Sequence, residues 1–125
     1  MGMRVGIDLV RTSDVGTSVA TFGDRYLRRV FTEAEVAYAN TSPDQTTARL
    51  AARFAAKEAT MKALDLSERG VNWNDIEVVK LPSGAPSIVL HGRAAEAAAD
   101  MDLSVSLSHE GDYATAVVLT SRKTQ

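Results

Sequence analysis

The stretch RLAARFAAKEATMKAL, residues 49–64, predicts the long helix around which the rest of the chain is organised. It contains no Gly or Pro and is dense in the residues with the highest helix propensity. At about 100° per residue, one narrow apolar stripe forms, and we expect it to face the core. Its members are Leu50, Phe54, Met61 and Leu64. Alanines cover the opposite side, where another backbone, a subunit or a ligand could approach closely: Ala52, Ala55, Ala56, Ala59 and Ala63.

Three charged residues of this helix need an explanation. Glu58 and Lys62 are four residues apart, in the order that favours an ion pair on a helix. Lys57 falls inside the apolar stripe, so it must extend to the surface, pair with an acid or serve chemistry. From the helix alone, a core helix with one solvated pair is the simpler interpretation, since structural ion pairs outnumber active sites.

Composition restricts the classes of protein to which the chain can belong. We treat residues 1–125 as one domain, long enough to bury a real core. The absence of Cys excludes disulfides and thiolate metal sites, and two distant histidines leave carboxylates as ligands for any divalent ion. A net charge of −2 argues against a nucleic-acid partner. Neither a membrane span nor a signal-peptide pattern is present, so we expect a cytoplasmic protein with no membrane partner.

The first predicted strand contains an acid. Residues 3–10 are apolar on both faces, so we expect a well-buried strand. Asp8 interrupts this run, and it either holds the following turn or ligates a metal at the end of the strand.

The remaining segments predict helices mixed with antiparallel strands. A weak helix covers residues 11–22, Asp24 could cap a short helix after it, and Thr32 with Glu35 begins another helix through a capping box. We therefore expect a single compact α+β domain, with a mainly antiparallel sheet packed against the long central helix. The other expected segments are strands at 73–81, 87–90, 103–108 and 113–120, a hairpin turn at 82–86, a helix at 92–101, polar loops at 40–45 and 65–70, and a turn at 109–112.

Two segments are candidate interaction surfaces. Arg25, Arg28 and Arg29 form either a solvated face or a docking patch for an acidic partner. Residues 103–108 alternate apolar side chains with serines, a pattern that suits a ligand or subunit contact. His109, in the turn that follows, is either an exposed residue or a group that binds phosphate or transfers a proton.

Asp8 and Glu58 together supply what a magnesium site requires. Proteins usually hold Mg²⁺ with one or two carboxylates, waters and substrate phosphate oxygens. Lys57, Lys62 and Arg53 would then face a multiply charged phosphate ligand. Acid-held metal and positioned cations are adequate equipment for phosphoryl transfer. The sequence has no Walker loop, dinucleotide fingerprint or G-x-S-x-G elbow.

Several motifs resemble those of a known family. The segments V-G-I-D-L-V, R-F-A-A-K-E-A-x-x-K-A-L and S-L-S-H-E-x-D-Y-A are similar to motifs of the holo-acyl-carrier-protein synthases, the small 4′-phosphopantetheinyl transferases. The separation of Asp8 from Glu58 agrees with this family, as do W-x-D-I-E-V-V at residues 73–79 and the G-x-P turn at 84–86. The resemblance covers residues 6–118 and favours an active site over a structural ion pair.

The resemblance implies a reaction and the residues for it. Family members use Mg²⁺ to transfer the phosphopantetheine arm of coenzyme A to a serine of an apo acyl carrier protein, and they are homotrimers with active sites between subunits. By position, Asp8 and Glu58 match the metal ligands, and Lys62 matches the group that stabilises or protonates the leaving phosphate. Glu58 or a metal-bound water would take the serine proton. The positions that match contacts near the nucleotide and its 3′-phosphate are Arg53, Gly84, Pro86, Ser108 and His109. We expect Lys57 and Lys62 to contact coenzyme A as well.

The chain departs from the family pattern in two places. Asp14 stands near the position of an arginine that docks the acidic carrier protein, and residues 65–67 replace a Gly-Thr-Gly loop. We therefore expect Arg25, Arg28 and Arg29 to carry more of the docking. Two alternative functions remain: a non-catalytic relative that binds nucleotide or carrier protein, and a small metal-dependent phosphohydrolase.

Overall fold

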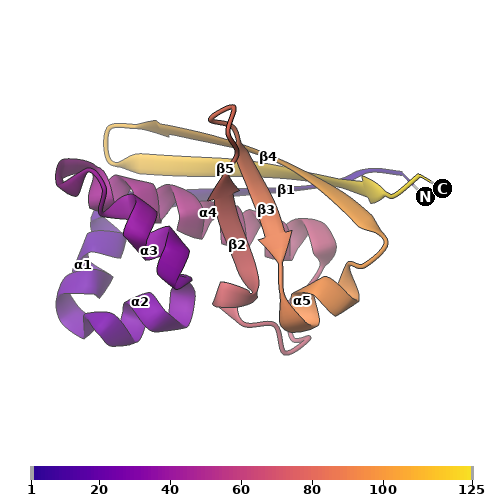
Figure 1. Ribbon diagram of the computed structural model, residues 1–125, viewed down its shortest axis with the longest axis horizontal. Coiled ribbons are helices and arrows are strands. Elements are labelled where there is room, and N and C mark those ends of the chain that lie inside the picture. Colours follow the sequence, from indigo (N-terminus) through magenta and orange to yellow (C-terminus); the bar gives the residue numbers. More distant parts are fainter. Residues whose placement is uncertain (1, 125) are drawn as a thin grey trace.

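A three-stranded antiparallel sheet forms the long layer of the molecule (Figure 1). The structure is a computed structural model that describes residues 2–124. The strands lie in the order β1-β5-β4, so the first strand pairs with the last. Their bounds are β1 (Arg4–Arg11), β4 (Met101–Glu110) and β5 (Tyr113–Arg122).

Helix α4 (Thr46–Leu64) packs across one face of this sheet, on β1 and β5. Its alanines make that contact, and a Cβ added to Gly6 would lie 2.0 Å from the carbonyl oxygen of Ala59. Of the three partners considered for the alanine side, another backbone is therefore the one found. The expected core stripe is only partly correct, because Leu50 is buried whereas Phe54, Met61 and Leu64 are half-buried.

No segment within residues 2–124 covers the β1 side chains on the other face of the sheet. Val5, Ile7 and Leu9 are 61%, 59% and 66% exposed, so the prediction of a well-buried first strand is wrong. The physical reason is that α4 covers one face only, and alternate residues of β1 point away from it. Leu119 of β5 is also exposed, which extends this apolar surface across two strands.

Smaller elements surround α4. In Figure 1, α1, α2 and α3 gather at one end of the long sheet, and the β2–β3 hairpin crosses the direction of its strands. No helix within residues 2–124 combines the length and the apolar character that crossing a bilayer requires. The bounds are α1 (Thr12–Phe22), α2 (Asp24–Val30), α3 (Glu33–Ala39), η1 (Pro43–Gln45), η2 (Trp73–Asp75), β2 (Ile76–Lys80), β3 (Pro86–Leu90) and α5 (Gly92–Ala97).

The helix starts and turns test the local predictions. The capping box of Thr32 and Glu35 is confirmed, with both reciprocal hydrogen bonds present. Asp24 is not a cap: Gly23 occupies that position, and Asp24 lies in the first turn, where its charge suits the helix dipole. His109 belongs to β4 and not to a turn, because the strand extends to the residue before Gly111.

Candidate active site

Asp8 and Lys62 meet where β1 crosses α4. The Nζ of Lys62 donates to Oδ1 of Asp8 at 3.2 Å and to the carbonyl oxygen of Ile7 at 2.9 Å. The close packing of Gly6 on α4 brings the strand within reach of this side chain. In the part of the chain that the structure describes, Lys62 therefore forms its ion pair with the strand, and not with Glu58 as the helical spacing predicted.

The charges of Asp8 and Lys62 both act on Glu58. Burial raises the pKa of Glu58, the negative charge of Asp8 raises it further, and Lys62 counteracts part of the shift. Asp8, Glu58 and Lys62 all line one cleft of about 420 Å³, which we call the carboxylate cleft. Residues of α1 and α2 complete its wall, and they include Asp14, Ser18 and Tyr26.

This grouping can hold a divalent cation in one particular way. Within residues 2–124 no set of three or more acidic or histidine side chains forms a full metal cage. Asp8 and Glu58 would supply two carboxylates, and the open cleft leaves the other positions for water and ligand oxygens, as Mg²⁺ prefers.

A second cleft, of about 510 Å³, is lined by Arg49 and Arg53, with Asp44 as an acid beside them, and we call it the cationic cleft. Arg53, Ser108 and His109, three of the predicted contacts for coenzyme A, all line it. The guanidinium carbons of Arg49 and Arg53 each lie 4.5 Å from the centre of the Tyr38 ring. The Nε of Arg53 is buried and has no hydrogen-bond partner among residues 2–124.

Tyr38 was not predicted as a site residue. Burial opposes ionisation of its hydroxyl, but the hydrogen bond from Lys80 and the charges of Arg49, Lys80 and Arg53 together lower the pKa of Tyr38. Arg49 lies four residues before Arg53 on the helix, so the sequence contained a signal for that pair. Tyr38 and Lys80 join it only through the fold.

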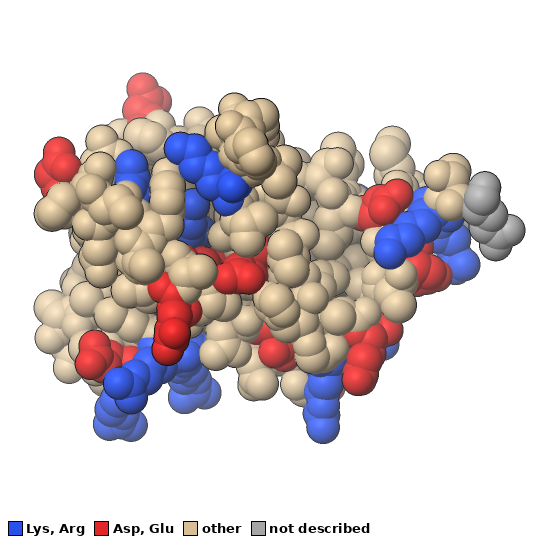
Figure 2. Space-filling view, viewed as in Figure 1, with Lys and Arg blue, Asp and Glu red and all other residues tan. Residues whose placement is uncertain are grey.

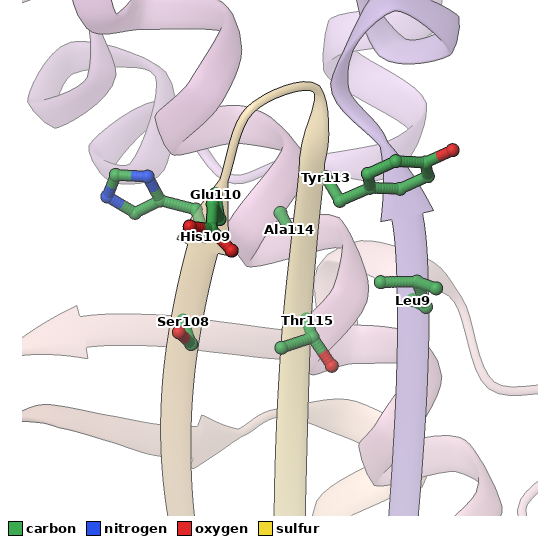
Figure 3. Close-up of a pocket in the computed structure, with 7 residues that line it drawn as sticks. All are labelled: Leu9, Ser108, His109, Glu110, Tyr113, Ala114 and Thr115. Atoms are coloured by element: carbon green, nitrogen blue, oxygen red, sulfur yellow. The ribbon is translucent and has the colours of Figure 1, made fainter.

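The end of the sheet carries Ser108 and His109 on opposite faces. Ser108 pairs in register with Thr115, which pairs with Leu9, so these side chains lie in one row on the uncovered face (Figure 3). They belong to a further cleft of about 420 Å³ that His109 and Tyr113 also border. Ser108 and His109 are therefore shared between the sheet end and the cationic cleft.

Gly84 and Pro86 lie apart from these residues. They belong to the β2–β3 hairpin, whose predicted turn is confirmed by hydrogen bonds between Leu81 and Ala85 and between Gly84 and Leu81, each 2.8 Å. Gly84 has a φ of 93°, which suits glycine. Neither Gly84 nor Pro86 lines the carboxylate cleft or the cationic cleft.

Lys57 lies in the core and lines neither cleft, so its predicted contact with coenzyme A stays a prediction. Its side chain is 0% exposed, and Nζ lies 2.7 Å from Oε1 of Glu35, which is equally buried. Nζ also donates to the carbonyl oxygens of Trp73 and Ile76. Burial lowers the pKa of Lys57, and the Glu35 carboxylate counteracts this. Of the three explanations for a lysine in the apolar stripe, pairing with an acid is the one found.

The three predicted docking arginines project from α2 into solvent. Figure 2 shows basic side chains at the lower left, where Figure 1 places α2. Arg25 and Arg29 border a groove of about 290 Å³ with Phe22 and Tyr26. Tyr26 also lines the carboxylate cleft, so the two surfaces are adjacent.

The sequence and the fold agree with those of known proteins. Residues 4–118 match the model of the 4′-phosphopantetheinyl transferase superfamily, and the chain belongs to this superfamily. Within it, the curated relatives carry the name holo-[acyl-carrier-protein] synthase. The protein of Koribacter versatilis is 43% identical over 123 residues, which is 95% of this chain and 98% of that protein. The protein of Gloeobacter violaceus is 45% identical over 118 residues, which is 92% of this chain and 89% of that protein.

Solved structures give the same result for the fold. The ACPS–CoA complex of Chronobacterium ammoniagenes superimposes with a TM-score of 0.85 at 32% sequence identity, covering 99% of this chain and all 100% of that one. The predicted fold class is thereby confirmed, as is the family that the motifs indicated.

Proposed function

We propose that this chain transfers the 4′-phosphopantetheine group of coenzyme A to a serine hydroxyl of an apo acyl carrier protein. The observation that carries the proposal is the meeting of Asp8, Glu58 and Lys62 at one open cleft, in a chain whose relatives are named for this reaction. In the reaction the serine oxygen forms a bond to the phosphorus that bears the pantetheine. The bond from this phosphorus to the bridging diphosphate oxygen breaks, and adenosine 3′,5′-bisphosphate leaves.

Mg²⁺ is the metal that the donor set fits. Asp8 and Glu58 are hard oxygen ligands, and the effect of the Asp8 charge on the pKa of Glu58 indicates a carboxylate pair that a cation would relieve. Bound Mg²⁺ would neutralise the charge of the diphosphate. Glu58 has a second role open to it, because a carboxylate that borders the cleft can accept the proton of the serine hydroxyl.

Lys62 acts on the leaving group. Its side chain is 54% exposed, so it can turn from Asp8 towards a ligand in the cleft while it remains attached to α4. A positioned ammonium stabilises the negative charge that develops on the departing phosphate. Arg49 and Arg53 supply positive charge, and His109 a hydrogen bond, for the 3′-phosphate of the nucleotide in the cationic cleft.

We propose a homotrimer as the active form. The exposed row of Val5, Ile7 and Leu9 supports assembly, because contiguous apolar side chains on a monomer surface mark an interface. Gly84 and Pro86 would then contribute to the coenzyme A site of a neighbouring copy, since they line neither cleft of their own chain.

Arg25, Arg28 and Arg29 would dock the acidic carrier protein beside the carboxylate cleft. All three are exposed on α2, so alanine substitution should leave the fold unchanged. We expect the triple variant to raise the KM for carrier protein with little change in the KM for coenzyme A, and to reduce the salt dependence of the reaction. An unchanged KM for carrier protein would contradict this docking surface.

The direct test is the intact mass of several apo carrier proteins after incubation with coenzyme A and Mg²⁺. Addition of one phosphopantetheine supports the proposal, and Asp8→Asn and Lys62→Met should each lower the rate by about 100-fold or more. Release of adenosine 3′,5′-bisphosphate without carrier protein would indicate a hydrolase. Binding of either substrate with no turnover would indicate a non-catalytic relative.

A further inference from the structure

The start of helix α1 lacks a cap of its own. Arg11 stands at the N-cap position, and its side chain makes no capping hydrogen bond. The first turns contain Thr12, Ser13 and Gly16, which have low helix propensity. A helix of this composition needs partners for its first amide groups from elsewhere in the fold.

Asp112, 99 residues further along the chain, supplies those partners. Its Oδ1 accepts a hydrogen bond from the amide of Ser13 at 2.9 Å, and its Oδ2 accepts one from the Ser13 hydroxyl at 2.6 Å. Its carbonyl oxygen accepts the amide of Thr12 at 2.7 Å. A carboxylate at this position also complements the positive end of the helix dipole.

The contacts of Asp112 with Thr12 and Ser13, which we call the clamp, join the turn next to the cationic cleft to the α1 wall of the carboxylate cleft. Asp112 belongs to the β4–β5 turn, three residues after His109 of the cationic cleft. Helix α1 contributes Asp14 and Ser18 to the wall of the carboxylate cleft. The guanidinium of Arg11 lies 5.3 Å from the centre of the Tyr113 ring and reinforces the same junction.

We propose that Asp112 is a positioning residue that holds the α1 wall of the transfer cleft in place for the carrier protein. The inference rests on the proposed function. No residue of α1 lines the cationic cleft, so loss of the clamp loosens the surface for the carrier protein and leaves the nucleotide contacts intact. The effect is therefore specific to one of the two substrates.

The experiment compares Asp112→Ala, Asp112→Asn and Ser13→Ala by steady-state kinetics with each substrate varied in turn. We expect Asp112→Ala to raise the KM for carrier protein about 5-fold. This factor corresponds to the free energy that the loss of a helix cap usually costs. Asp112→Asn, which still caps, should recover most of this loss. Adding Ser13→Ala to Asp112→Ala should change little more, because Asp112→Ala already removes the contact with the Ser13 hydroxyl. Asp102→Ala is the matched control, since Asp102 is an exposed acid on the same hairpin.

An unchanged KM for carrier protein in Asp112→Ala, or equal rises for both substrates, would overturn the proposal. Amide hydrogen exchange at Ser13 provides a second readout without turnover, and Asp112→Ala should accelerate it while Asp102→Ala does not. If the wild-type chain transfers nothing, the proposed function fails, and exchange at Ser13 still decides whether the clamp exists.

Discussion

Replacing Lys57 by Met tests how the buried ion pair holds the fold. The substitution keeps the length of the side chain and removes its charge. Glu35 would then be a buried carboxylate whose remaining donors within residues 2–124 are the amides of Thr32 and Val78, at 2.9 Å and 2.8 Å. The carbonyl oxygens that Lys57 now satisfies would lose their donor. Removing one partner of a buried pair costs about 3–5 kcal/mol of unfolding free energy.

Urea unfolding measures this cost. A loss of about 3–5 kcal/mol lowers the urea midpoint by about 2 M for a domain of this size. The protein concentration is kept the same for all variants, because assembly makes apparent stability depend on it. Lys62→Met is the matched control on the same helix, because an exposed pair contributes at most about 1 kcal/mol. For activity we expect the reverse order: Lys62→Met loses transfer, whereas Lys57→Met keeps it as long as the protein is folded. A midpoint for Lys57→Met within error of the wild type would refute the reasoning.

Three further changes test other parts of the structure. Asp65 adopts the left-handed conformation with a φ of 53°, so Asp65→Gly should raise the unfolding free energy by about 1 kcal/mol, measured in urea. Gly6→Ala would bring a Cβ to within 2.0 Å of the α4 backbone, so it should destabilise the chain by about 1–3 kcal/mol and lower the transfer rate. Burial raises the pKa of Glu77, but hydrogen bonds from Thr32 and His91 outweigh this effect and lower the pKa below its ordinary value. Its contribution to stability is thus present above about pH 4.5 and lost as the pH falls through the lowered pKa, so Glu77→Gln should be less stable at pH 7, with the difference disappearing in acid. A pH-independent difference would contradict this.

Local patterns in the sequence were sufficient for most of the fold. The helix propensity of residues 49–64, the capping box at Thr32 and the turn at residues 82–86 each depend on neighbours within four residues. Which face of a strand is covered depends on distant elements. For this reason the exposure of Ile7 was missed.

The central residues of the site were also predictable from the sequence, whereas their contacts were not. Motif resemblance identified Asp8, Glu58 and Lys62, and the fold brings them to one cleft. The partner of Lys62 could not be predicted, because helical spacing indicates Glu58 while tertiary packing brings Asp8 closer. Similarly, Lys57 binds an acid 22 residues away on another helix, and no periodicity reports such a contact.

The alanines between α4 and β1 have a consequence for the precision of catalysis. An alanine side chain has no torsion angle that moves a heavy atom, so this interface has no alternative rotamers between which it can exchange. The distance between the helix axis and the strand is therefore set by backbone contact, as at Gly6 and Ala59. Asp8 and Lys62 are carried on the two sides of that contact, so the spacing of their backbones does not depend on side-chain rotamers, while the Lys62 side chain stays free to turn towards a ligand.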